Sequence, residues 1–318
     1  MNQRTTSALA SLTALAILAC SVGAQTTPDA KPIAVVNGEP IPAGDIDRVA
    51  DMILKEKFKV QPPTEVQRRQ VRMEVLHLAL NNILMRQFLK KSAPKIEQAE
   101  LDKHVAEFVA NLQKAQPGKT LADFCKEKST TEAQLRADMT ATLQWTAYVK
   151  ANVTDAAVKK YYDDSKDFFD QVAVKASHVF IQIPPKTSEG DKLAAKQKLE
   201  ALRAEIVAGK LDFAEAARKH SQCPSATQGG DIGYLARKGM YEESFSRTAF
   251  ALKPGEVSEV VATGFGLHLL RVTERKPGHS SDFEKIKGEI TDFYVEEMQQ
   301  KMLLQERQAA KIEINLPE

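Results

Sequence analysis

The first half of the chain repeats hydrophobic residues at the spacing of a helix. Met73, Leu76, Leu80 and Ile83 lie at i, i+3, i+7 and i+10, which is the apolar stripe of an amphipathic helix. Comparable patterns predict further helices over 92–115, 120–128, 131–151 and 153–169. Before them, residues 33–41 place apolar positions on both sides of an Asn-Gly pair, the strongest short-range signal of a β-hairpin. The sequence therefore predicts a hairpin followed by a mainly α-helical domain.

A different pattern begins near residue 172. Val179 and Ile181 alternate with His178 and Phe180, which is the spacing of a β-strand. The segments that follow predict a helix over 192–209, a shorter helix over 212–221, and closing strands over 255–263 and 266–274. The helical pattern returns after residue 282 and ends at the strand-like stretch "KIEINL". A strand–helix–helix–strand–strand module of about a hundred residues is thus predicted between helical segments.

These patterns together predict an α+β protein. A domain with an antiparallel β-sheet and surrounding helices is inserted into a mainly α-helical domain. The predicted divisions are residues 1–24, 31–170, 171–278 and 279–318. The first is a signal segment and the second is the N-terminal part of the helical domain. The third is the sheet domain, and the last is a C-terminal helix and strand that return to the helical domain.

The N-terminal segment has the features of an export signal. Arg4 is followed by an apolar run of about a dozen residues, which is too short to span a bilayer and typical of a secretory signal peptide. Small residues before Gln25 predict cleavage after Ala24. The stretch 17–20 also resembles a lipobox, which would leave a lipid-modified Cys20 as the first residue. No later segment is apolar enough to cross a membrane, so we expect a periplasmic or otherwise extracytoplasmic protein, free or lipid-anchored.

Charge and cysteine content narrow the function classes. The chain has 44 Lys and Arg against 42 Asp and Glu, so no global positive field attracts nucleic acid. Removal of the signal leaves Cys125 and Cys223. They fall in different predicted domains, and we expect two free thiols. The sequence has no CxxC pair and no His/Cys cluster at metal-ligand spacing, so we expect no metal site.

Residues 172–276 resemble the parvulin peptidyl-prolyl isomerases. The matching stretches follow one another in the family's order: "ASHVFIQI", "GKLDFAEAARKHSQCPSATQGGDIGYLARKGM" and "FSRTAFALKPGEVSEVVATGFGLHLLRVTE". The flanking hairpin and helices are similar to the chaperone domain of SurA/PrsA-type exported foldases. The resemblance implies cofactor-free isomerisation of X-Pro bonds in unfolded or partly folded proline-containing polypeptides.

The resemblance also implies a set of site residues. The family lines its pocket for the proline ring with a methionine and a phenylalanine, and the matching residues here are Met240 and Phe245. Two further apolar candidates are Ile232 and Leu235. The family's two strand histidines and a nearby threonine match His178, His268 and Thr263. Cys223 stands where parvulins carry a cysteine or an aspartate, and we interpret it as a polar group beside the twisting amide, not as a covalent nucleophile.

The sequence departs from the family pattern in two places. Met240 and Phe245 are five positions apart, where the family usually has four. Either the loop bulges by one residue or Tyr241 takes the place of the methionine. The segment after His178 lacks the basic cluster of phosphate-directed parvulins, so we expect no requirement for a phosphorylated residue before proline.

The leading hypothesis is an exported foldase whose helical domain binds unfolded chains and whose parvulin domain isomerises X-Pro bonds. A second hypothesis is a holdase chaperone with a catalytically weak parvulin-like binding domain, which the unusual Met240–Phe245 spacing favours. A third is a secreted factor that acts on one dedicated partner.

Overall fold

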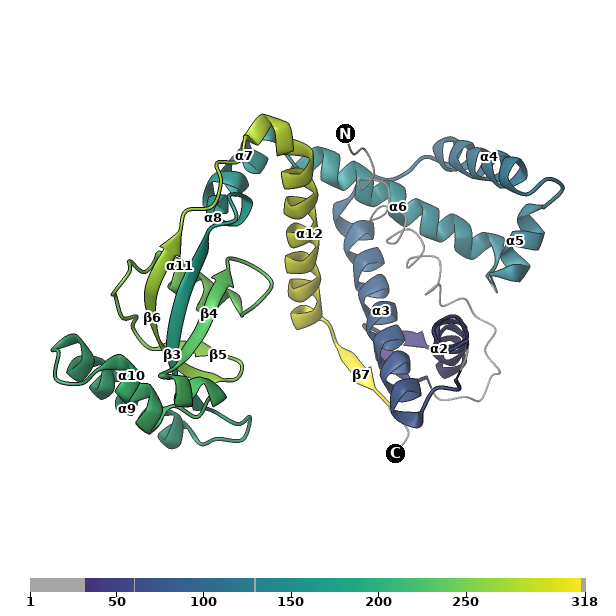
Figure 1. The fold of residues 1–318 in the computed structure, drawn as a ribbon. Helices are drawn as coiled ribbons and strands as arrows, with labels where there is room; N and C mark the ends of the chain where they lie inside the picture. The colour runs from purple at the N-terminus through teal and green to yellow at the C-terminus, as the bar shows by residue number, and fades with distance from the viewer. Residues whose placement is uncertain (1–31, 60, 129, 316–318) are drawn as a thin grey trace. The chain divides into compact units, whose positions relative to one another are not determined.

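The computed structural model describes residues 32–59, 61–128 and 130–315, which form two compact units (Figure 1). The first unit extends to Thr154 and resumes at Asp292, and the second runs from Asp155 to Thr291. The expected signal segment 1–24, with Cys20, lies outside the described residues. Over those three ranges, no helix combines the length and apolar character needed to cross a bilayer.

The first unit is a small sheet packed on helices. Its elements are β1 (Ala34–Val36), β2 (Glu39–Ile41), α2 (Ala43–Lys57), α3 (Glu65–Ser92), α4 (Gln98–Ala115), α5 (Leu121–Glu127), α6 (Glu132–Asn152), most of α12 (Phe283–Ala309) and β7 (Ile312–Ile314). Asn37 and Gly38 both have positive φ, of 51° and 87°, as a type I′ hairpin turn requires. The predicted hairpin is therefore confirmed.

The C-terminal strand completes this sheet. β7 pairs antiparallel with β1, and the strand order is β2-β1-β7. The side chain of Asn37 accepts a hydrogen bond from the Lys311 backbone N–H at 2.9 Å. Leu76, Leu80 and Ile83 are buried on α3, so the predicted apolar stripe forms the core between the hairpin, α2 and α3.

The second unit is built on a four-stranded antiparallel sheet with the order β4-β3-β6-β5. Its elements are α7 (Asp155–Asp164), α8 (Lys166–Phe169), β3 (Ala173–Gln182), α9 (Glu189–Val207), α10 (Phe213–His220), the 3₁₀ helix η1 (Pro224–Gln228), β4 (Asp231–Ala236), α11 (Glu243–Ala251), β5 (Val261–Thr263) and β6 (Gly266–Lys276). The long strand β3 lies between β4 and β6 (Figure 1).

Alternation along the strands separates two faces of this sheet. Val179, Ile181 and Leu269 pack with residues of α9 and α10 in one apolar cluster. On the opposite face, Leu270 and Val272 of β6 pack against α11 in a second cluster, which includes Phe245. His268 precedes Leu269 on β6 and therefore faces α11. This face, covered by α11, carries the candidate site.

Three elements of the second unit, η1, β4 and α11, were not predicted. The sequence predicts no strand at β4, because as an edge strand it is mostly half-buried and lacks clear alternation. α11 has only nine residues and no side-chain cap on its N-terminus. The strand predicted over 255–263 was too long. Only Val261–Thr263 pairs as a strand. Before it, the Leu270 backbone N–H donates to the Ser258 hydroxyl at 2.9 Å, where a regular strand would offer a backbone carbonyl.

Candidate functional site

The segment that carries Cys223 precedes β4 in the chain and runs beside the C-terminal half of β3. The Phe180 backbone N–H donates to the Ser221 hydroxyl at 3.0 Å, and the Gln222 N–H donates to the Phe180 carbonyl at 2.8 Å. Further along, the His178 N–H donates to the Gly230 carbonyl at 2.9 Å. A Cβ on Gly230, whose φ is +81°, would lie 2.4 Å from the His178 carbonyl oxygen. Only glycine allows this close approach, and the approach places Cys223 at the edge of β3.

Two buried histidines form the centre of the site. His178 on β3 and His268 on β6 bring their Nδ1 atoms to 3.3 Å. The Nε2 of His268 lies 2.9 Å from the Thr263 hydroxyl. Burial lowers the pKa of His178 to about 4. Burial, and then the neighbouring His178, lower the pKa of His268 to about 4 as well. Both imidazoles are therefore neutral at physiological pH.

One tautomer arrangement satisfies every donor of this pair. His178 Nδ1–H donates to His268 Nδ1, and His268 Nε2–H donates to the Thr263 hydroxyl. The Thr263 hydroxyl donates in turn to the Gly266 carbonyl at 3.3 Å. The His178 Nε2 is then an unprotonated acceptor, and it is buried without a hydrogen-bond partner among the described residues. The reverse arrangement would bury an unpaired N–H there, which costs more.

Aromatic rings surround the imidazoles. Phe245 presents its ring at right angles to His268, with centroids 5.2 Å apart, and it also contacts His178 edge-on at 6.0 Å. Phe180 stacks on His268 at 4.7 Å, and Tyr241 stacks on Phe245 at 4.5 Å. These separations are those of favourable aromatic pairs. We call His178, His268, Phe180, Phe245 and Tyr241 the histidine–aromatic cluster.

Cys223 is a neighbour of Tyr241. Burial raises the pKa of the Tyr241 hydroxyl, and the charge of a Cys223 thiolate raises it further, which requires the two groups to be close. Cys223 is a partly exposed free thiol, and Cys125 is a buried one. Gln222, the residue before it, is bonded to Phe180 of the histidine–aromatic cluster, so Cys223 lies near that cluster.

A carboxylate holds the residue that precedes α11. Both oxygens of Glu242 accept the Gly264 backbone N–H, at 3.0 and 3.1 Å. This contact ties the turn after Thr263 to the residue that precedes α11. Next to it, Arg237 forms two hydrogen bonds to Glu243 at 2.8 and 2.6 Å. The loop between β4 and α11 is thus held at both ends.

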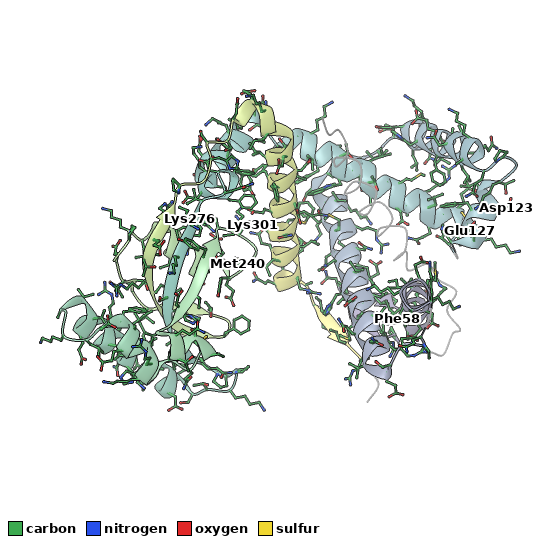
Figure 2. The ribbon with its side chains drawn as sticks, viewed as in Figure 1. Phe58, Asp123, Glu127, Met240, Lys276 and Lys301 are labelled. Carbon is green, nitrogen blue, oxygen red and sulfur yellow. The ribbon has the colours of Figure 1, made fainter. Side chains whose placement is uncertain are left out.

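Three of the residues expected in the site, Met240, Ile232 and Leu235, lie outside the histidine–aromatic cluster. Met240 projects from the loop after β4 (Figure 2) with 55% of its surface exposed, and its sulfur accepts the Ala236 N–H at 3.3 Å. Ile232 is half-buried at the edge of the core. Leu235 is a core residue that pairs with Val174, four positions along β3 from His178. Leu235 and Ile232 thus pack in the apolar cluster that contains Phe245, and Met240 lies at the surface.

Two residues of the site were not predicted. Phe180 stands two positions after His178, so strand alternation alone places both side chains on one face. Glu242 gave no sequence signal, because its role depends on a turn 22 residues away. Apart from the Glu242 carboxylate, the site combines apolar ring surfaces with neutral hydrogen-bonding groups. Over the described ranges, no group of three His, Cys, Asp or Glu side chains could hold a metal ion.

Comparisons with known proteins agree with this geometry. Residues 178–274 match the family described as rotamase, PPIC-type PPIASE domain. The chain is 30% identical over 292 residues to the foldase protein PrsA of Staphylococcus aureus (strain Newman), covering 88% of this chain and 79% of that protein. It is 38% identical over 111 residues to the chaperone SurA of Albidiferax ferrireducens, covering 35% of this chain.

Coverage of other relatives is smaller. The aligned part spans 23% of that SurA and 42% of the foldase protein PrsA of Bacillus subtilis. The crystal structure of the peptidylprolyl isomerase PrsA from Bacillus anthracis is 24% identical, with a TM-score of 0.39 over 75% of this chain and 99% of that one. Because the match to the staphylococcal PrsA extends over most of both chains and includes the PPIC-type domain, this chain belongs to the SurA/PrsA-like family of parvulin-type peptidyl-prolyl isomerases.

Proposed function

We propose that this protein is an extracytoplasmic foldase that isomerises X-Pro bonds in unfolded or partly folded polypeptides. The observation that supports it best is the histidine–aromatic cluster, in which two neutral imidazoles form the floor beneath aromatic walls. The partly exposed Cys223 directly follows Gln222, whose N–H donates to the Phe180 carbonyl of this cluster. Apolar walls of this kind suit a proline ring, and neutral polar groups suit the amide next to it.

The reaction needs no more than such a pocket. Rotation about an X-Pro bond has a barrier of roughly 20 kcal/mol, because twisting the amide removes its resonance. No proton or group is transferred. A catalyst has only to bind the twisted amide more tightly than the planar one. A neutral site favours the twisted form, because twisting reduces the charge separation of the amide.

Proline-limited refolding tests the proposal. We expect the full chain, at a small fraction of the client concentration, to accelerate the slow phase of a protein whose refolding waits on proline isomerisation. Acceleration that needs stoichiometric protein would favour the alternative, a holdase with a catalytically weak parvulin-like domain. A slow phase that is unchanged at any ratio would contradict both.

We also propose that the first unit binds unfolded segments. Met52 and Leu78, on α2 and α3, and Val66 on α3 are large apolar side chains that are exposed. Light scattering in the same refolding reaction measures aggregation, and stoichiometric protein should suppress it. The expected domain divisions at 171 and 278 remain a proposal, beside unit boundaries at Asp155 and Thr291.

Export is proposed from the sequence of residues 1–24. Cleavage after Ala24 gives a soluble extracytoplasmic protein, and the intact mass of the exported chain measures it. A mass that corresponds to a diacylated N-terminal Cys20 would instead show that the protein is lipid-anchored.

The Cys223 thiol should act as a polar neighbour of the amide. We expect Cys223→Asp to retain kcat/KM within about tenfold of the wild type, since an aspartate supplies a polar group but no thiol. Cys223→Ala should lose more, because it leaves no polar atom at this position. A peptide assay of X-Pro isomerisation measures both variants. Inactivity of folded Cys223→Asp, together with a covalent adduct on the wild type, would instead indicate a nucleophile.

Tyr241 should contribute more than Met240 to the proline pocket. Its ring stacks on Phe245, whereas Met240 is largely exposed. Truncating one apolar contact with substrate costs roughly tenfold in kcat/KM, so we expect that loss for Tyr241→Ala and a smaller loss for Met240→Ala. Circular dichroism controls for folding. A larger loss for Met240→Ala would place the methionine in the pocket, as the family pattern implies.

A further inference from the structure

A cavity lies on the face of the sheet that α9 and α10 cover. Its volume is about 640 Å³, within the roughly 300–1,000 Å³ typical of small-ligand sites. Its apolar lining includes Ile206, Leu211, Phe213 and Val257, and Arg203 and Arg271 also line it. Arg271 alternates with His268 and Leu270 along β6, so it lies on the face opposite the histidine–aromatic cluster. The cavity is therefore separate from the proposed isomerase site.

Arg271 is the distinctive group of this cavity. Its Nε is buried and has no hydrogen-bond acceptor among the described residues. Across the same ranges, no carboxylate lies within ion-pair distance of its guanidinium. The neighbouring Arg203 is engaged, since its Nε donates to the Ser258 carbonyl at 2.8 Å and its guanidinium pairs with Glu259. A buried donor without an acceptor is costly, and a guanidinium is well suited to bind a carboxylate.

The charges around the cavity limit the ligand. Asp212 and Glu256 also line it. The Asp212 carboxylate caps α10 through the Glu215 N–H, and the Glu256 carboxylate accepts the Lys253 N–H. Two carboxylates at the wall would repel a dianion such as a phosphate, but one unpaired guanidinium can still hold a monoanion. The apolar lining favours a hydrocarbon group attached to that anion.

We propose that this cavity binds the C-terminus of a polypeptide, with the terminal carboxylate on Arg271 and an apolar last side chain among Ile206, Leu211 and Phe213. A chain end carries one negative charge directly beside its last side chain, which matches the charge and lining of the cavity. The site gives the second unit a contact for a client chain that does not depend on proline. The proposal does not rest on catalysis at the histidine–aromatic cluster.

Fluorescence anisotropy with the full chain tests this proposal. The probe is a fluorescein-labelled peptide, Gly-Ser-Gly-Ala-Ala-Leu, with a free carboxylate and no proline. We expect its C-terminal amide to bind at least tenfold more weakly. Arg271→Met keeps the length of the side chain and removes the guanidinium, so it should cause a loss of the same size. Arg218→Met is the matched control, because Arg218 is an exposed arginine on α10 outside the cavity lining.

A cavity-filling variant and an activity control complete the test. Val207→Trp, at an exposed position of the lining, should weaken binding by filling the cavity without disturbing the core. Both Arg271→Met and Val207→Trp should retain wild-type isomerisation of a proline peptide. Equal affinity for the acid and the amide would overturn the proposal, as would equal losses in Arg271→Met and Arg218→Met. Equal binding of an amidated peptide with a glutamate side chain would show recognition of any carboxylate, and would also overturn it.

Discussion

Replacing Phe245 by alanine should reduce both the stability of the second unit and its activity. The ring is 1% exposed and belongs to the apolar cluster on the α11 face. Truncating a buried phenylalanine costs about 3–5 kcal/mol of unfolding free energy, and the lost edge-on contacts with His178 and His268 fall within that cost. In the variant that remains folded, we expect kcat/KM to fall at least roughly tenfold, since one apolar wall of the proline pocket is gone.

A matched variant separates the two effects. Phe213 is 2% exposed in the cluster on the opposite face, so Phe213→Ala should cost a similar free energy of unfolding in urea. It does not touch the histidine–aromatic cluster and should keep near-wild-type kcat/KM under conditions where circular dichroism shows a folded protein. Full activity of folded Phe245→Ala would show that the proline pocket lies elsewhere, and so would equal activity losses in the two variants.

Local patterns predicted the parts of the fold whose signals lie within a few residues. The Asn37-Gly38 turn needs only two residues with positive φ, and the α3 stripe needs only helical spacing. β4 has no such local signal, because an edge strand beside a glycine-rich turn is mostly half-buried and shows no clear alternation. The register of β3 against β6 sets His178 next to His268, and it depends on residues 90 positions apart. Strand alternation gives a face, but it does not give a register.

The site shows the same limit. Family resemblance pointed to Cys223, His178, His268, Thr263 and Phe245. In the structure the last four are linked by hydrogen bonds and ring contacts, and Cys223 follows the residue that bonds to Phe180. The family resemblance does not decide how the extra residue between Met240 and Phe245 is accommodated. In the structure the loop turns the Tyr241 ring onto Phe245 and leaves the methionine at the surface. That outcome depends on packing against β6 and β5, which no local pattern contains.

The buried histidine pair should make stability depend steeply on pH. In the folded protein the pKa of each imidazole is about 4, and in the unfolded chain it is about 6.5. Between these values the unfolded state binds more protons than the folded state, so stability falls as the pH falls from 6.5 to 4. A shift of this size corresponds to about 3 kcal/mol for each histidine, and below pH 4 the loss is complete. Two such losses are comparable to the whole stability of a typical domain.

Urea unfolding of the second unit, followed by circular dichroism at several pH values, measures this loss. Carboxylates titrate near the lower end of the window. Asp170 titrates lower still. Burial raises its pKa, but its hydrogen bonds to Lys166 and Ser281 outweigh this effect and hold the pKa at about 2.

The informative quantity is therefore the difference in the pH dependence of stability between the wild type and His268→Gln. The glutamine can retain the bond to Thr263 but cannot take up a proton. We expect this variant to lose about half of the pH dependence between 6.5 and 4. His279→Gln, at an exposed position in the same unit, is the control for the substitution itself. A wild-type stability that stays level over this range, or equal slopes in all three proteins, would mean that the imidazoles are not held neutral by burial and that the neutral floor proposed for the proline site is wrong.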